Sequence, residues 1–303
     1  MTLQTLRTEL DGCVLTVRID NPPSDLMDAA VVADLLQLGR RLSADATVRA
    51  VVITGPRPGV FVPHFLIDEI LAGTEALGMP TPYVAARTAL AAVSLVRRVP
   101  GGRQALVRTP AAGLLQLADT HEALGRLTRL PQVVVAAIDG DAQGGGCELA
   151  LACDVRVMSD GPYLIGLPEL SAGIPPGAGG TQRLMAAVGA ARARAMILTA
   201  HTLAPREALA AGLVDEVTSD DQTMSRAMEL AHATTRWNPA SVRAAKRALR
   251  PGGLRGGLAR EAGGFVSSVS GATAIDQLRD FVAASDSAGG RTPWRDRSGL
   301  PGR

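Results

Sequence analysis

Two glutamates stand in segments whose composition could support acid–base chemistry. Glu148 closely follows three consecutive glycines, Gly144, Gly145 and Gly146, where an apolar run gives way to small, helix-favouring residues. A glycine turn that opens a helix exposes backbone N–H groups that the helix itself leaves unpaired. Together with the positive end of the helix dipole, these donors suit a developing negative charge. The alternative is that the glycines allow close packing and Glu148 merely favours a helix N-terminus.

The second glutamate, Glu169, directly follows Pro168 within the otherwise apolar stretch 165–170. A carboxylate in such surroundings is costly unless it has a partner or a function. The glycine-rich segment 177–180 comes next, and it could bring backbone N–H groups close to a bound molecule. An exposed Pro-Glu turn is the alternative interpretation. Both segments are therefore candidates for a site that uses carboxylates and backbone amides.

The sequence lacks the signatures of several other kinds of site. Residues 144–148 do not have the G-x-G-x-x-G spacing of a dinucleotide fold, and the segment contains neither Gly-Lys-Ser/Thr nor G-x-S-x-G. The four histidines are scattered, so we expect no metal site. Cys13, Cys147 and Cys153 show no C-x-x-C spacing, which is typical of reduced thiols in a cytoplasmic protein.

Composition narrows the class of protein further. The chain has 303 residues, of which 47% are hydrophobic but only 3% aromatic, so we expect an aliphatic core of the α/β kind. A formal charge of +2 does not favour a nucleic-acid partner. Residues 1–11 do not resemble a secretory signal, and we find no uninterrupted apolar run of about 18 residues, so no membrane association is expected.

Hydrophobic periodicity predicts alternating strands and helices in the first third of the chain and mostly helices after residue 179. The predicted strands are 13–19, Ala50–Thr54, Val133–Ile138, 155–158 and 214–217. The predicted helices are 28–42, 83–99, 111–127, 223–236, 241–249 and 272–284. A loop is expected around residues 100–110, and the tail from residue 285 has a composition that favours disorder unless it packs on a partner. Strand, helix and buried strand in this order indicate stacked βα units.

The combined pattern resembles the enoyl-CoA hydratase/isomerase family, the crotonase superfamily. The line D-G-x-A-x-G-G-G-C-E-L-A through G-A-G-G-T-Q-R-L is similar to that family over residues 131–184, and the likeness continues through residues 195–217. The resemblance implies an α/β, crotonase-like spiral of ββα units over residues 1–200, with an acyl-CoA site. It implies a helical C-terminal region, residues 201–303, which packs on neighbouring subunits in a homotrimer or homohexamer.

The resemblance also implies roles for particular residues. The N–H groups of Phe65 and Gly145 would form an oxyanion hole for the thioester, and Glu148 and Glu169 would act on water, with the roles of acid and base left open. The backbone of Gly177 would help to hold that water. The remaining residues expected at the substrate are Pro63, His64, Leu66, Ile67 and Gly144.

Three departures from the family pattern concern the substrate side. His64 replaces the usual glycine, which matters if that position needs a positive φ, and Leu66 replaces the usual aspartate. The stretch 68–130 is longer than is usual in the family, so the acyl preference could be unusual.

The resemblance implies hydration of a 2-enoyl-CoA to a 3-hydroxyacyl-CoA, with no cofactor beyond the coenzyme A of the substrate. The alternatives are a double-bond isomerase of the same family and a non-catalytic protein that binds acyl-CoA.

Overall fold

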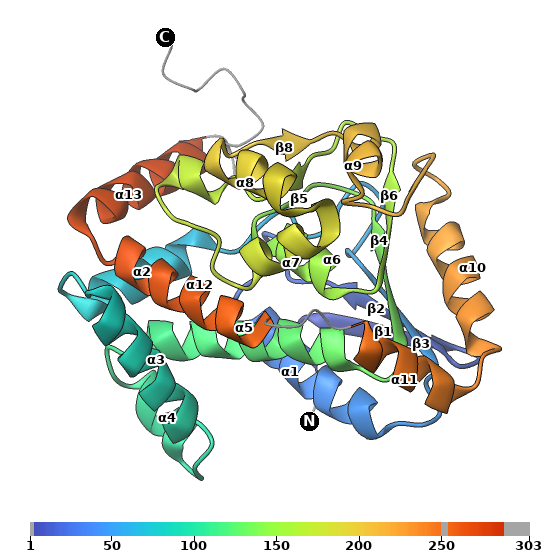
Figure 1. The fold of residues 1–303 in the computed structure, drawn as a ribbon, viewed down its shortest axis with the longest axis horizontal. Coiled ribbons are helices and arrows are strands. Elements are labelled where there is room, and N and C mark those ends of the chain that lie inside the picture. Colours follow the sequence, from blue (N-terminus) through green and yellow to red (C-terminus); the bar gives the residue numbers. More distant parts are fainter. Residues whose placement is uncertain (1–2, 250–253, 288–303) are drawn as a thin grey trace.

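The computed structural model describes residues 3–249 and 254–287 and is built around a twisted six-stranded sheet (Figure 1). Its strand order is β1-β2-β3-β4-β6-β9, with β1 and β2 antiparallel and the other neighbours parallel. The strands are β1 (Leu6–Asp11), β2 (Val14–Ile19), β3 (Ala50–Thr54), β4 (Val133–Ile138), β6 (Val155–Ser159) and β9 (Glu216–Thr218). The predicted bounds of β3 and β4 are confirmed, whereas β1 was not predicted.

A second, three-stranded sheet lies next to the first and contains β5 (Ala142–Gln143), β7 (Ile165–Gly166) and β8 (Thr202–Leu203). Strands β5 and β7 are parallel, and β8 runs antiparallel to β7. Strand β5 comes directly before the glycine turn, so the pairing of β5 with β7 ties the two glutamate-bearing segments together at their bases.

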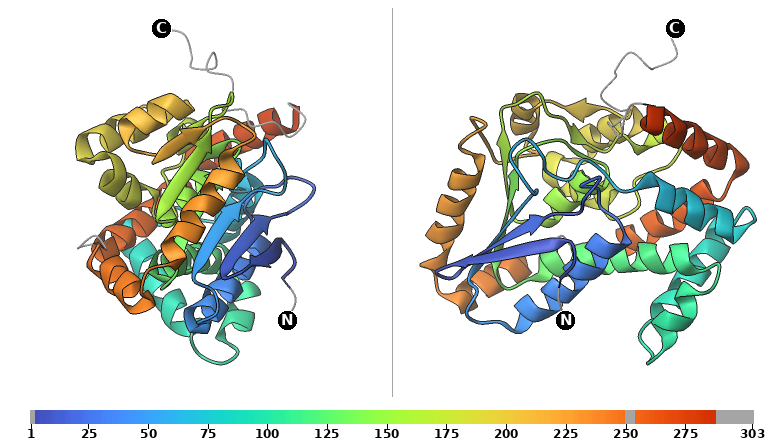
Figure 2. Two further views of the ribbon diagram at one scale, coloured as in Figure 1. Left: turned by 90° about the vertical axis from the view of Figure 1, so that its right-hand side faces the viewer. Right: turned by 180° about the vertical axis from the view of Figure 1, so that it is seen from behind.

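Helices cover both faces of the six-stranded sheet (Figure 2). Side chains alternate along β3, so that Val52 faces α10 (Thr223–Thr235) while Val51 and Ile53 face the opposite side. The opposite face is covered by α1 (Ala29–Ala44), α5 (Ala112–Arg129) and α6 (Gly145–Ala152), whose apolar residues form the largest core cluster. Asp28 is the N-cap of α1, because its Oδ1 accepts a hydrogen bond from Val31 N at 2.9 Å.

The stretch 68–130 is helical, and the part of it before α5 extends to one side of the sheet (Figure 1). Its helices are α2 (Ile67–Leu77), α3 (Tyr83–Val96), α4 (Gly102–Val107) and the already described α5. Helix α3 ends earlier than predicted, and the loop expected around residues 100–110 contains the short helix α4.

The expected helical C-terminal region is present. Within residues 201–287 it comprises α9 (Pro205–Ala211), α10, α11 (Pro239–Ala248), α12 (Leu254–Val269) and α13 (Ala272–Ser287), and it follows α7 (Gly180–Val188) and α8 (Ala190–Leu198). Helix α12 packs on α3 and α7, and α13 packs on α2 and on the 3₁₀ helix η1 (Glu169–Ala172), all within the same chain. Packing on neighbouring subunits and the division near residue 200 stay predictions. Residues 285–287 continue α13, and the rest of the tail lies outside the described residues.

No helix within the described ranges is long and apolar enough to cross a membrane.

Candidate active site

The glycine turn places Glu148 in the first turn of a buried helix. Gly144 adopts a positive φ of 50° with ψ of −119°, a conformation that side chains rarely tolerate, and α6 begins at the next residue. Every residue of α6 is buried, and Glu148 is only 4% exposed. The sequence therefore predicted both the turn and the helix that starts there.

Phe65 and Gly145 come into direct contact. A Cβ placed on Gly145 would lie 3.2 Å from Phe65 N and 2.8 Å from Met27 Cε, so only glycine fits here without displacement. Met27 N donates to His64 O at 3.0 Å, and Leu66 N donates to Met27 O at 2.8 Å. These two hydrogen bonds form a parallel β-bridge between Met27 and Phe65, and they use the C=O before Phe65 and the N–H after it. The N–H of Phe65 itself therefore points away from Met27. In the part of the chain that is described, neither Phe65 N nor Gly145 N donates a hydrogen bond to another residue.

His64 does not need the backbone conformation that glycine would supply. Among described residues other than glycine, a positive φ occurs at Asp25 and Ala200 and not at His64. The His64 ring is buried, and because Phe65 O can only accept, the ring nitrogen Nδ1 carries the proton and donates to it at 2.7 Å. Burial lowers the pKa of His64, so the ring is neutral. His64 therefore helps to fix the conformation of the loop 63–66.

The other residues that were predicted at the substrate or in the oxyanion hole divide into two groups. Phe65, Ile67 and Gly144 line a cavity beside the glutamates. Pro63 and Leu66, like His64, are not among the described residues that line the cavity. Instead Pro63 O accepts from Gln143 N at 2.9 Å, which ties the loop to β5.

Glu148 is held by the loop that precedes α7. Its Oε1 accepts hydrogen bonds from Ala178 N and Gly180 N, each at 2.8 Å. A Cβ on Gly180 would lie 2.7 Å from that same oxygen, so the carboxylate and the loop are in close contact. Two amide donors favour the ionised form of this carboxylate.

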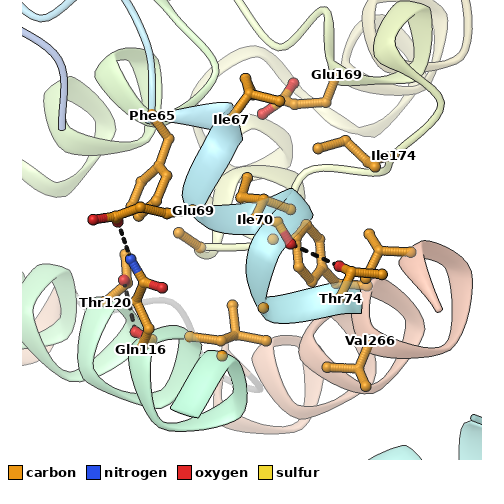
Figure 3. A pocket seen from close by; sticks show the side chains of 18 of the residues that line it. Phe65, Ile67, Glu69, Ile70, Thr74, Gln116, Thr120, Glu169, Ile174 and Val266 are labelled. Atoms are coloured by element: carbon orange, nitrogen blue, oxygen red, sulfur yellow. Dashed lines mark hydrogen bonds between the residues drawn. The ribbon is translucent and has the colours of Figure 1, made fainter. Parts of the chain in front are cut away.

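Glu169 has a different environment. It begins η1 after Pro168 and is 6% exposed, and its Oε2 has no hydrogen-bond partner among the described residues. Glu169 lines the same cavity as Glu148 and Gly145. Figure 3 shows its side chain near Ile67 and Ile174 at one end of the cavity. The exposed Pro-Glu turn considered above is therefore wrong.

Burial shifts the titration of both acids. It raises the pKa of Glu148 to about 8, with Glu261 adding to the shift and the two amides opposing it. Burial also raises the pKa of Glu169 well above its usual value, and the nearby charge of Glu148 adds to this. Two close carboxylates do not readily ionise together, so the pair favours one charged and one neutral member.

The 177–181 loop is held by side chains that the sequence analysis missed. His121 Nε2 donates to Gly177 O at 2.6 Å, and Arg183 Nη1 donates to Ala178 O at 2.8 Å. Burial lowers the pKa of His121 to about 4, so this histidine is neutral. Glu261 accepts from Gly179 N and from Thr181 N. His121 on α5 and Glu261 on α12 are remote in sequence from the loop, so no local pattern marked them, whereas Arg183 on α7 follows the loop directly.

The cavity continues from the glutamates between α2, α5 and α12. Its wall is mostly apolar and includes Ile67, Ile70, Leu77, Leu114, Leu117, Ile174, Phe265, Val266 and Val269. Its volume of about 90 Å³ exceeds the roughly 10–15 Å³ that one water needs, so there is room for a chain of several carbon atoms. Glu69 lies in the wall near Phe65, where it accepts hydrogen bonds from the Gln116 side chain and from Ala29 N (Figure 3).

Within residues 3–249 and 254–287, no group of three or more His, Cys, Asp or Glu residues is arranged to hold a metal ion.

Comparison with known proteins gives a consistent family. A model described as enoyl-CoA hydratase/isomerase matches residues 112–254. The chain is 44% identical over 149 residues to the 2,3-dehydroadipyl-CoA hydratase of Escherichia coli (strain K12), covering 48% of this chain and 58% of that protein. The chain spans about half the length of the curated relatives that it matches.

Solved structures extend the likeness over almost the whole chain. A putative enoyl-CoA hydratase from Streptomyces avermitilis superposes with a TM-score of 0.74 at 23% identity, covering 98% of this chain and 96% of that one. An enoyl-CoA hydratase from Bacillus anthracis superposes with a TM-score of 0.65 at 26% identity, covering 92% and 96%. The predicted crotonase-like fold is thereby confirmed.

Proposed function

We propose that this chain, which belongs to the enoyl-CoA hydratase/isomerase family of the crotonase superfamily, adds water to a 2-enoyl-CoA and yields a 3-hydroxyacyl-CoA. The observation that carries the proposal is that two buried glutamates, Glu148 and Glu169, line one cavity. Hydration needs one group that takes a proton from water and another that gives a proton to the α-carbon. Two carboxyl groups in opposite protonation states meet that need.

The backbone N–H groups of Phe65 and Gly145, which donate to no other described residue, support a site for the thioester oxygen. When oxygen adds to the β-carbon, electron density moves onto the thioester carbonyl and an enolate forms. A backbone donor aimed at this charge contributes roughly 3–4 kcal/mol to its stabilisation. In this proposal the two amides hold the enolate until the α-carbon is protonated.

The environments of the two acids favour one assignment of roles. Glu148 accepts two backbone hydrogen bonds, which stabilise its charge, so it acts as the base that removes a proton from water. Glu169 has an oxygen without a described partner and acts as the protonated acid that delivers its proton to the α-carbon. After the step Glu148 carries a proton and Glu169 is charged. One proton transfer between them restores the starting state.

The backbone of Gly177 supports the position of the attacking water. Gly177 lines the cavity, and its N–H donates to no other residue in the described ranges. The apolar wall supports an apolar acyl group as the substrate's tail.

The proposal requires no metal and no cofactor other than the coenzyme A carried by the substrate. A cytoplasmic location and a homotrimeric or homohexameric state also belong to the proposal.

Turnover of crotonyl-CoA and of longer 2-enoyl-CoA substrates tests the proposal, followed as the loss of the conjugated thioester absorbance. We expect the wild-type protein to be active and Glu148→Gln and Glu169→Gln each to lower kcat by about 10²- to 10⁴-fold. Glu216→Gln is the matched control, because this surface acid on β9 pairs with Arg226 away from the cavity. A folded wild-type protein without activity on any chain length would contradict the proposal.

A double-bond isomerase is the second candidate, and one observation favours it. An isomerase needs a single base. Of the two glutamates, only Glu169 has a buried oxygen, Oε2, without a described partner, so it is the candidate for that base. The same variants discriminate, with a 3-enoyl-CoA as substrate. An isomerase would tolerate Glu148→Gln while losing activity with Glu169→Gln, whereas a hydratase requires both acids.

A further inference from the structure

Glu261 and Glu148 bond to the same run of backbone amides, although Glu261 lies on α12, in the C-terminal region. Glu148 accepts the N–H groups of Ala178 and Gly180. Glu261 accepts the N–H groups of Gly179 and Thr181, the second at 2.9 Å, and also the Thr181 hydroxyl. Four successive N–H groups are thus distributed in alternation between two carboxylates.

This alternation makes the loop a rigid link between the two acids. The two amides bonded to Glu148 lie on either side of one that is bonded to Glu261, and the reverse is also true. A shift of either carboxylate would therefore turn the peptides that hold the other carboxylate. Phe265 lies one turn after Glu261 on α12 and contacts the start of the loop, since a Cβ on Gly177 would lie 2.5 Å from Phe265 Cδ2. Helix α12 therefore contacts the loop at its start through Phe265 and at its end through Glu261.

The charged groups that act on Glu148 come from three elements, α12, η1 and α7. Glu261 faces it from α12, Glu169 from η1 and Arg183 from α7, while the neighbouring Cys147 is a buried thiol whose own pKa is raised. The negative charge of Glu261 raises the pKa of Glu148, and the positive charge of Arg183 lowers it. Removal of the Glu261 charge therefore makes Glu148 easier to ionise.

We propose that Glu261 is a positioning residue for Glu148, which fixes the 177–181 loop and sets the charge environment of the base. The inference rests on the proposed hydratase function for its kinetic consequences. It adds that α12, a helix of the C-terminal region, is part of the machinery that prepares the catalytic carboxylate, through Glu261. Glu261 acts through the loop and is not among the described residues that line the cavity.

The test compares wild type with Glu261→Gln, Glu261→Asp and the control Glu216→Gln, for kcat and KM on crotonyl-CoA between about pH 5 and about pH 10. A displaced catalytic group costs about 10- to 100-fold in rate, so we expect that loss in kcat for Glu261→Gln, with KM changed by less than about threefold. The acid limb of its pH profile should move to lower pH. Glu261→Asp keeps the charge and should keep the limb in place.

A second readout is independent of activity. Hydrogen exchange of the peptide covering residues 175–185 should be faster in Glu261→Gln than in wild type and unchanged in Glu216→Gln, at equal Tm. If wild type hydrates crotonyl-CoA but Glu261→Gln changes neither kcat, the acid limb nor exchange, the positioning role is overturned. If wild type is inactive while exchange still rises in Glu261→Gln, the proposed function fails and the role of Glu261 in fixing the loop stands.

Discussion

At the scale of single residues, Glu148 and Glu169 differ in their environments more than in their burial. Glu148 accepts two backbone N–H groups, whereas Glu169 presents an oxygen without a described partner. Two glutamates that line the same cavity can therefore differ in protonation state, one ionised and one neutral. This difference supports the division into base and acid, which the sequence left open.

The pH dependence of kcat follows from these environments. Activity requires Glu148 ionised and Glu169 protonated. Because the pKa of Glu148 is raised to about 8, the acid limb of the profile should lie near pH 8. Ionisation of Glu169, whose pKa burial raises well above its usual value, should produce the alkaline limb. The measurement is kcat for crotonyl-CoA across this range. A profile that stays flat through the neutral region would contradict the assignment of Glu148 as a base with a raised pKa.

At this scale the sequence predicted the glycine turn and the helix that follows it, because both depend on neighbouring residues. Gly145 and Glu148 lie three residues apart in one turn, and the positive φ of Gly144 explains why glycine stands there. Glu261 and His121 were missed because each reaches the loop from a helix remote in sequence. The concern about His64 had a physical answer, since its backbone does not enter the region that favours glycine.

At the scale of elements, the 177–181 loop is the part that brings the site together. Side chains from α5, α6, α7 and α12 bond to its peptides, so the loop transmits the packing of four helices to the carboxylate of Glu148. The peptide between Gly177 and Ala178 shows this directly: its C=O accepts from His121 and its N–H donates to Glu148.

His121→Phe should make the position of the peptide between Gly177 and Ala178 less fixed. The buried Gly177 carbonyl loses its donor, which costs about 1–3 kcal/mol of stability, and kcat should fall as Glu148 loses its fixed support. Thermal unfolding and crotonyl-CoA kinetics measure the two effects. His201→Gln, at an exposed position, is the control and should change neither quantity. A His121→Phe protein with wild-type kcat would show that this peptide does not position Glu148.

Elements were predictable where hydrophobic pattern alone decides them. Continuous apolar runs predicted β3 and β4 with correct bounds, because buried parallel strands need apolar residues on both faces. Strand β1 was missed because only Leu6 of its residues is buried, so no core-facing pattern marks it. Helix α4 was missed because it is short, follows Gly101 in a left-handed conformation and has no side-chain cap.

At the scale of the whole molecule, the fold keeps several carboxyl groups out of water. Burial raises the pKa values of Glu148, Glu169 and Glu261 above those of an unfolded chain. The folded state therefore binds more protons than the unfolded state at neutral pH. The contribution of these groups to stability is fully present below their unfolded pKa and is lost as pH rises through the folded values.

Glu169→Gln should remove part of this pH dependence. The variant lacks a group that must ionise in the core, so its Tm should exceed that of wild type at pH about 9, with a smaller difference at pH about 5. Thermal unfolding at the two pH values provides the comparison, and Glu216→Gln serves as the surface control. Equal Tm differences at both pH values would mean that Glu169 is not a buried acid with a raised pKa.

The most direct measurement of the central claim is the fate of solvent oxygen. Wild-type protein is incubated with crotonyl-CoA in ¹⁸O-labelled water, and the product is analysed by mass spectrometry. We expect a 3-hydroxyacyl-CoA that carries one labelled oxygen at the β-carbon, formed by wild type and Glu216→Gln but not at a comparable rate by Glu148→Gln or Glu169→Gln. Absence of labelled product with wild type, or its undiminished formation by either cavity variant, would contradict hydration by the two glutamates.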